Sequence, residues 1–362
     1  MFGPPPPAPR RSGGGWKVAA LIFLVLLVLS ALGNLGSALS GVLAHSKGMR
    51  SMRSREANLG ESVIQEAESD TDDKIAVIDI NGIITGQPER GGLSLPNSIE
   101  AQLKTIAHDK LVRAVILKID SPGGEVLASD EIYNLLVDFQ AQNKEKPVLA
   151  SMGGLAASGG YYVAAPCQYL LANELTITGS IGVIMHGYNY RGFMDKIGVI
   201  PETFKSGRFK DMLSGEKEPG ETDPEEKAMM QAMINETFGR FKHIVAEGRQ
   251  SANKRNGTKG RHLSARWEDF ADGRVLTAHQ ALDLGLIDQI GDFKAAVKTA
   301  KEMAGISDAS LIKYEQPFDL ANLFRLLGQA KTEAPILKID LGFDAPKLQA
   351  GRPYYLLPIS AR

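Results

Sequence analysis

Residues 152–165 read MGGLAASGGYYVAA and follow PVLAS, an apolar run typical of a buried strand. The stretch holds one serine, Ser158, among four glycines and four alanines. Small neighbours leave its hydroxyl open and let the backbone approach a substrate closely. A helix is expected just beyond, so free N–H groups, that of Gly159 first, would favour an oxyanion. The alternative interpretation is that Ser158 merely caps this helix.

Strand and helix patterns alternate around this stretch. KIAVIDINGIITG (74–86) predicts two short strands joined by a turn at Asn81–Gly82, and further strands are expected at 113–120 and 147–152. Helices are expected at 98–107 and 129–140, and a long one begins at Pro224, with Asp223 as N-cap and Glu226 placed for a capping box. This alternation predicts an α/β fold with a parallel sheet.

Composition excludes several classes of protein. The chain has 362 residues, 43% of them hydrophobic, which is enough for one large domain or two modest ones. Its formal charge of -1 gives no basic surface, so nucleic acid is not an expected partner. The single cysteine, Cys167, excludes an intramolecular disulfide and a cysteine-rich metal site.

The N-terminal part predicts a membrane anchor. A Pro- and Gly-rich leader (1–16) precedes an apolar segment (17–43) that carries no charge after Lys17. A removed signal peptide is the alternative, and basic residues on both sides leave the orientation open. A polar linker (44–73), a folded domain (74–305) and a C-terminal extension (306–362) are expected to follow.

A second glycine-rich loop, DSPGG (120–124), follows the strand AVILKI. Gly123 and Gly124 permit a conformation that aims N–H groups into the crevice at the end of the strand. A plain strand-to-helix turn is the alternative. Because neighbouring parallel strands end at the same edge, both glycine-rich loops are expected to open onto one cleft.

A serine nucleophile needs a base, and three residues are candidates. Lys210 lies near Phe209, Met212 and Leu213, and apolar surroundings would favour its neutral amine. Lys205 and His186 are the alternatives, and a solvated surface role is the default for either lysine.

Ser180, in ITGSIGVIM, could orient such an amine with its hydroxyl. The alternative is a simple turn between glycines.

Five motifs stand in order between residues 75 and 305: DSPGG, AASGGYYVAA, ITGSIGVIM, KSGRFKDM and GRVLTAHQALDLGLID. In this combination the chain resembles the signal peptide peptidase A (protease IV) family in its short, single-repeat form. The resemblance implies the spiral α/β fold of the Clp protease and crotonase type.

The resemblance also assigns roles. Ser158 would be the nucleophile and Lys210 the general base, with Ser180 holding the lysine amine. Gly159 and one glycine of the Gly123–Gly124 pair, taken as Gly124, would form the oxyanion hole. In double-length members the lysine is placed differently along the sequence, which keeps Lys205 as an alternative.

The family further implies a ring-like homo-oligomer in the cell membrane, with a single-pass anchor and an extracytoplasmic catalytic domain. It would cut hydrophobic peptides such as remnant signal peptides, and its chemistry requires no metal or cofactor. A crotonase-like acyl-CoA enzyme and an inactive membrane scaffold are the alternatives. The apolar tail YYLLPISAR (354–362) could also enter the active site of its own or a neighbouring copy.

Overall fold

The computed structural model describes residues 59–88, 92–218, 220–316 and 353–356. The expected leader (1–16) and anchor (17–43) lie outside the described residues. Within the described ranges, no helix combines the length and apolar character needed to cross a bilayer.

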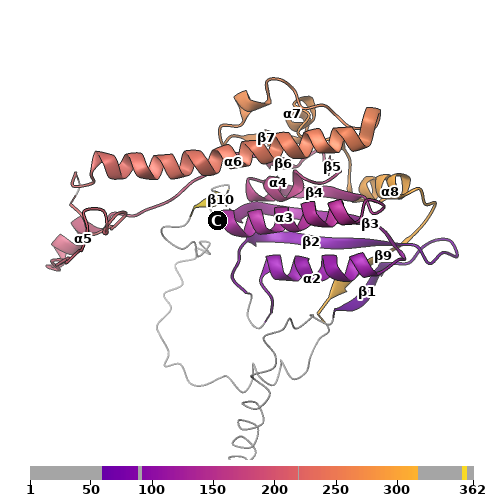
Figure 1. The fold of residues 1–362 in the computed structure, drawn as a ribbon, viewed down its shortest axis with the longest axis horizontal. Helices are drawn as coiled ribbons and strands as arrows, with labels where there is room; N and C mark the ends of the chain where they lie inside the picture. Colours follow the sequence, from indigo (N-terminus) through magenta and orange to yellow (C-terminus); the bar gives the residue numbers. More distant parts are fainter. Residues whose placement is uncertain (1–58, 89–91, 219, 317–352, 357–362) are drawn as a thin grey trace, which may run out of the picture. The chain divides into compact units, whose positions relative to one another are not determined.

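A mixed, mainly parallel sheet forms the centre of the fold (Figure 1). Its main path runs β1 (Gly60–Gln65), β9 (Ser310–Glu315), β2 (Lys74–Ile84), β3 (Val112–Glu125), β4 (Val148–Ala157), β5 (Tyr169–Ala172) and β8 (Gln289–Ile290). From β9 to β8 neighbouring strands are parallel, whereas β1 is antiparallel to β9. The predicted α/β class is confirmed.

Three short strands extend the sheet where β3 and β4 end. β6 (Ile177–Gly179) lies parallel to the last residues of β4 and antiparallel to β7 (Val275–Thr277). β10 (Tyr354–Leu356) lies antiparallel to the last residues of β3. These pairings bring distant parts of the chain to one edge.

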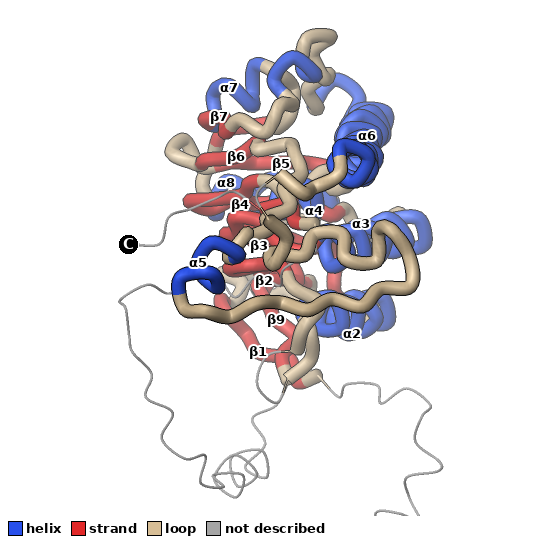
Figure 2. The backbone as a smooth tube through the Cα atoms, turned by 90° about the vertical axis from the view of Figure 1, so that its left-hand side faces the viewer, coloured by secondary structure: helices blue, strands red, loops and turns tan. Residues whose placement is uncertain are grey.

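Helices cover both faces of the sheet, as the side chains of β3 explain. Val115, Leu117 and Ile119 face the large core under α2 (Leu95–His108), α3 (Val126–Gln142), α4 (Gly159–Ala164) and α6 (Pro224–Asn256). The alternate residues Ala114 and Ile116 pack with Ala296 and Ala300 of α8 (Phe293–Ala304). Figure 2 shows α8 on one side of the strands and the larger helices on the other. Burial on both faces accounts for the nearly continuous apolar strands.

Three sequence-based expectations about boundaries are wrong. KIAVIDINGII is one strand, β2, whose register shifts between Asn81 and Ile83, with Gly82 at a φ of 69°. A glycine-centred bulge therefore replaces the expected turn between two strands. The linker predicted over 44–73 contains β1, and the sheet continues past residue 305 into β9. β1 is exposed along its whole length, so no burial pattern marked it.

The long helix α6 begins as expected but without the predicted capping box. The Asp223 side chain accepts a hydrogen bond from the Glu225 N–H, and Pro224 occupies the first turn. The Glu226 carboxylate instead accepts from Leu213 N–H (2.8 Å) and Lys217 Nζ (2.6 Å). Glu226 thus holds the segment that precedes the helix.

The second half of α6 is fixed to the sheet by a buried ion pair. Arg249 Nη2 lies 2.5 Å from Asp288 Oδ1, and both side chains are 0% exposed. Asp288 also accepts hydrogen bonds from the Leu170 and Arg261 amides. The pair therefore joins α6 to β5 and to the turn before β8.

Replacing Arg249 with Met should lower the free energy of unfolding by about 3 kcal/mol, because it leaves the Asp288 charge buried without its cation. Urea denaturation measures the change. The control is Arg266→Met, which breaks an exposed pair with Asp269 and should cost less than about 1 kcal/mol. Equal effects of the two substitutions would contradict a structural role for the buried pair.

Candidate active site

Ser158 stands at the junction of β4 and α4 in an unusual backbone conformation. Its φ is 54° and its ψ is -119°, its N–H donates to Gly179 O (2.9 Å), and the residue is only 1% exposed. The side chain makes no capping hydrogen bond to α4. The capping interpretation of Ser158 is therefore wrong, and its hydroxyl is not committed to the helix.

Ser180 lies beside Ser158 and shares its conformation. Ala157 pairs with Gly179 in the parallel β4–β6 ladder, so the next residue of each strand is one of the two serines. Ser180 has a φ of 48°, is buried, and donates its N–H to Arg274 O (2.7 Å). Non-glycine residues held at positive φ cost about 1–3 kcal/mol each and cluster at functional sites. In the described part of the chain only Leu213 shares this feature.

The glycine-rich segments touch each other through their backbones. A Cβ on Gly159 would lie 2.7 Å from Ser129 Oγ, 3.0 Å from Gly124 N and 3.1 Å from Gly123 Cα. A Cβ on Gly124 would lie 1.9 Å from Ile84 O. A side chain on Gly159 would push the two glycine-rich segments apart, and a side chain on Gly124 would push β3 away from Ile84 of β2. Close packing therefore requires glycine at both positions, in addition to the approach of a substrate to the backbone.

The DSPGG segment is part of β3 rather than a loop after it. Gly123 has a φ of 97°, and its N–H donates to Ser121 Oγ (3.1 Å), which in turn donates to Gly82 O (2.6 Å). The Gly123 amide is thus engaged within its own segment. Gly124 lies next to Gly159 and pairs with Tyr355 of β10, so its amide stays a candidate oxyanion donor for a peptide that replaces the tail.

The C-terminal strand β10 lies against this same segment of its own chain. Tyr354, Tyr355 and Leu356 pair with Glu125, Gly124 and Gly123 respectively. On the other side Tyr354 exchanges two hydrogen bonds with Ile184, of 3.0 and 3.1 Å. The tail therefore occupies a slot between the end of β3 and the segment that follows Ser180.

The three candidate bases differ in their surroundings. Lys205 Nζ lies 2.8 Å from Asp211 Oδ2, and this hydrogen bond lowers the pKa of the Asp211 carboxyl. Lys210 is exposed, and its ammonium makes no hydrogen bond or ion pair with the described residues. His186 is also exposed. The apolar surroundings expected for Lys210 are not supplied by the single chain.

Lys210 belongs to an arm, residues 185–223, that projects from the body together with the start of α6 (Figure 1). Arg208 pairs with Asp223 and Glu225 at the beginning of this helix. Among the described residues no hydrogen bond or ion pair joins the arm to Ser158, and Figure 1 shows the arm projecting away from α4, the helix that Ser158 precedes. The single chain therefore brings the two serines and the glycines together and holds Lys210 on the arm.

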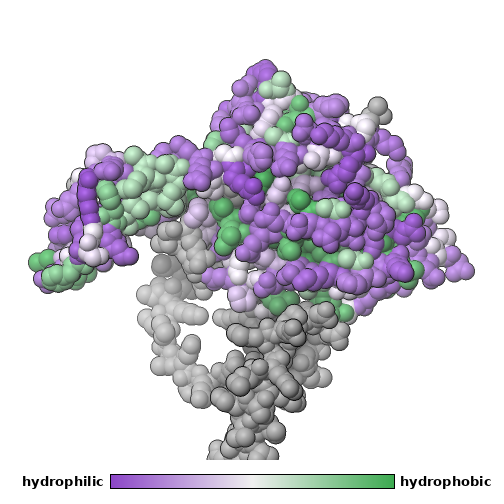
Figure 3. Space-filling view, viewed as in Figure 1, coloured by the Kyte–Doolittle hydropathy of each residue, from purple (hydrophilic) through white to green (hydrophobic). Residues whose placement is uncertain are grey.

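The arm exposes apolar side chains, which Figure 3 shows as green surface on the projecting part. Eight large apolar residues there are exposed: Tyr188, Tyr190, Phe193, Ile197, Val199, Ile200, Phe204 and Leu213. Phe204 is 88% exposed and Tyr188 is 81% exposed. A patch of this kind is typical of a protein interface.

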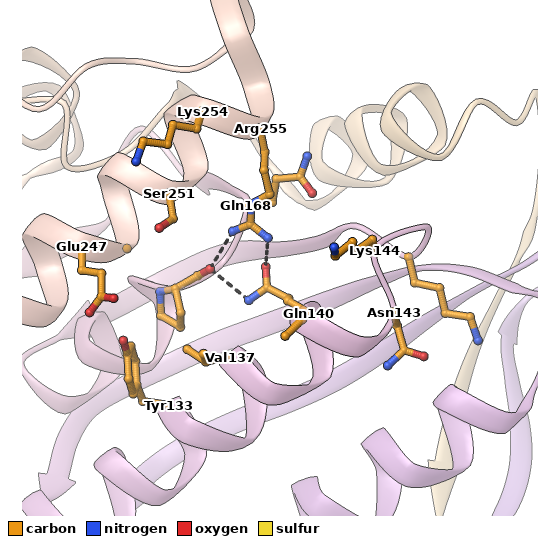
Figure 4. A pocket seen from close by; sticks show the side chains of 14 residues that line it. Tyr133, Val137, Gln140, Asn143, Lys144, Gln168, Glu247, Ser251, Lys254 and Arg255 are labelled. Atoms are coloured by element: carbon orange, nitrogen blue, oxygen red, sulfur yellow. Dashed lines mark hydrogen bonds between the residues drawn. The ribbon is translucent and has the colours of Figure 1, made fainter.

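A separate hollow between α3 and the second half of α6 is shown in Figure 4. It measures about 660 Å³, and Ser158 is not among its lining residues. Its Arg255 donates to Gln140 Oε1 (2.9 Å) and to Pro166 O (3.4 Å). These bonds fix one helix to the other, so we interpret the hollow as structural.

Some site residues were not found from the sequence. Ser129, whose hydroxyl donates to Glu125 O (2.9 Å), limits the space at Gly159. Ile184 supplies the second edge of the slot. Their signals were weak, since a serine in a helix and an isoleucine in an apolar run are ordinary residues.

Comparisons with known proteins show the family of the chain. Residues 140–307 match the family described as Peptidase family S49. The chain is 36% identical over 275 residues to a putative protease of Synechocystis, covering 76% of this chain and 90% of that protein. It is 35% identical to a putative signal peptide peptidase SppA of Enterococcus faecium, covering 70% of each. Protease 4 of Salmonella typhi is 33% identical, over 68% of this chain and 37% of that protein.

Among solved structures, a ClpP1 variant from Listeria monocytogenes aligns with a TM-score of 0.36 and 15% identity, covering 61% of this chain and 94% of that one. A TM-score of this size carries no argument about fold or function.

Replacing Ser158 with Gly should give a protein about 1 kcal/mol more stable than replacing it with Ala, because glycine adopts a positive φ without strain. Urea denaturation of both variants measures the difference. The control is Ser251 in the interior of α6, where Gly should be the less stable replacement by about 1 kcal/mol. The same sign at both positions would argue against strain at Ser158.

Proposed function

Because the chain belongs to peptidase family S49, we propose that it is a serine endopeptidase with Ser158 as nucleophile and Lys210 as general base. The observation that carries this proposal is the strained, uncapped Ser158 beside a slot that already holds an extended peptide, β10. Hydrogen bonding on both sides recognises a peptide main chain whatever its sequence. Peptides are therefore the substrates that this site suits best.

The proposed reaction uses a small set of groups. A neutral Lys210 amine takes the Ser158 proton as the hydroxyl attacks the peptide carbonyl, while the Ser180 hydroxyl orients the amine. The Gly159 and Gly124 amides stabilise the oxyanion. The protonated Lys210 then gives its proton to the nitrogen of the leaving peptide, and the lysine becomes neutral again as the acyl-enzyme forms. The neutral Lys210 amine next takes a proton from the water that hydrolyses the acyl-enzyme. Lys210, which has no hydrogen bond or ion pair with the described residues, suits this role better than Lys205, which is bonded to Asp211.

We place Lys210 in the site of a neighbouring copy. The single chain holds it on a projecting arm, away from its own serine, and the arm carries an exposed apolar surface. Packing that surface against a second copy would bury both the patch and the lysine, and burial would favour the neutral amine. Repetition around a closed ring gives the homo-oligomer expected from the sequence.

The anchor over 17–43 would hold such a ring at the cell membrane, with the catalytic domains outside the cytoplasm. Hydrophobic peptides released in the membrane, such as remnant signal peptides, are the proposed substrates. The similarity to a putative signal peptide peptidase of Enterococcus supports this class.

The two alternative functions explain the site less well. A crotonase-like acyl-CoA enzyme would use a pair of backbone amides and no serine nucleophile. Such a function would not explain the strained backbone at Ser158. An inactive scaffold would not need an unpaired lysine together with two serines at positive φ.

Ser158→Ala and Lys210→Ala should each lower kcat/KM for an internally quenched peptide by about a thousandfold or more. Lys205→Ala, the matched control on the same arm, should keep most of the activity. Normal hydrolysis by Lys210→Ala would refute the assigned base.

Mixing the inactive Ser158→Ala and Lys210→Ala proteins under conditions that exchange subunits tests where the lysine comes from. Random mixing should restore about a quarter of wild-type activity, since a functional site then pairs an intact serine with a neighbour's intact lysine. Each variant incubated alone is the control. No recovery after confirmed exchange would show that the lysine does not come from a neighbour.

Removing residues 353–362 should lower KM for peptide substrates, because β10 competes for the slot that substrates need. Steady-state hydrolysis by the shortened and full-length chains measures the change. Removing only residues 357–362 is the control, as it leaves β10 in place. An unchanged KM in the shorter chain would show that the tail does not compete.

A further inference from the structure

A cavity of about 570 Å³ lies at the end of the slot, where β10 begins. Pro353 forms part of its wall, with Val126, Leu127 and Asp130 of α3, Tyr162 of α4, and Glu236 of α6 among the other lining residues. Its size is that of a typical ligand pocket. None of the catalytic groups assigned above lines it.

The pairing of the tail shows which peptide position faces this cavity. Pro353 O accepts a hydrogen bond from Val126 N–H (3.4 Å), so the peptide is still in register with β3 at this point. Side chains of a strand point alternately to opposite faces. Tyr354 is buried (4% exposed), whereas its neighbour Pro353 lines the cavity. The cavity therefore receives the side chain three positions before Leu356.

The charges around the cavity are unequal. Three carboxylates, those of Glu125, Asp130 and Glu236, face one guanidinium, that of Arg240. Asp130 is already paired, because it accepts from Tyr162 Oη (2.5 Å) and Arg240 Nη2 (3.0 Å). The Glu125 carboxylate accepts from Gly86 N–H (3.2 Å). Glu236 is exposed and makes no ion pair with the described residues, so the cavity keeps an excess of negative charge.

The walls are partly apolar, which restricts the kind of cation that fits. Val126 and Leu127 line the cavity, and Leu127 is 68% exposed. Long basic side chains bury an aliphatic stem against such a surface and keep the charged end near solvent.

We propose that this cavity is a specificity subsite that selects a lysine or arginine side chain at the peptide position held here by Pro353. The proposal rests on the proposed peptidase function, since it names a preference of that slot. Glu236 is the residue that the incoming cation would meet, and Leu127 is the surface that its stem would cover.

The test uses the tail as the bound peptide, in full-length Ser158→Ala protein so that the tail stays intact. Pro353→Lys, Pro353→Met and Pro353→Glu are compared by hydrogen exchange of the amides at 123–128, which docking of the tail protects. Exchange should be about two- to fivefold slower with Lys than with Met, the range of an exposed ion pair, and fastest with Glu.

Glu236→Gln should remove the advantage of Lys over Met, whereas Glu247→Gln, a carboxylate on the same helix but outside the cavity, should preserve it. Equal exchange in the three tail variants, or an advantage that survives Glu236→Gln, overturns the proposal. The readout does not depend on hydrolysis. The subsite proposal can therefore be refuted while Ser158-dependent cleavage of peptides still supports the proposed function. The exchange result can equally support the subsite when no cleavage of peptides is found.

Discussion

The hydrogen bond from Ser158 N–H to Gly179 O (2.9 Å) is the interaction on which the site depends. It continues the β4–β6 ladder by one more residue, yet the chain must turn into α4 at that point. A positive φ satisfies both demands, and the serine side chain makes no capping hydrogen bond to the helix. The local strain is therefore the result of joining a strand, a helix and a neighbouring strand at one residue, and the rest of the sheet supplies the stability that sustains it.

The same junction determines how a peptide can bind. Since Gly159 packs directly on Gly123 and Gly124, the end of β3 lies beside Ser158, the proposed nucleophile, with its outer edge available for another strand. β10 uses that edge, and Ile184 supplies the opposite one. In the proposed mechanism, peptide recognition and oxyanion stabilisation would therefore draw on adjacent amides of one short segment. A side chain at Gly124 would collide with Ile84 and disturb both.

Patterns within short stretches of sequence predicted much of this arrangement, and contacts between distant stretches account for what they missed. The α/β class, α6 with its Asp223 cap, and the clustering of Ser158, Ser180 and the glycines follow from periodicity and local spacing. β1 was missed because it forms only by pairing with β9, a strand far away in the chain. The apolar tail was expected to be extended, but its sequence did not show that it pairs with the end of β3. Glu226 has the spacing of a capping box but binds Lys217, since the fold of the arm puts an ammonium within its reach.

The ion pairs of the arm explain why Lys210 is suited to act on another molecule. Asp211 and Glu226 engage Lys205 and Lys217, and the hydrogen bond to Glu226 raises the pKa of Lys217. These bonds hold the arm in shape. Lys210, between them, has no such partner in the described part of the chain. The exposed apolar residues of the same arm supply a reason for the arm to be buried against another molecule. In the proposed ring, assembly would therefore bring the Lys210 amine to Ser158 of a neighbouring copy. An isolated chain would hold Ser158 in its strained conformation but would have no general base beside it.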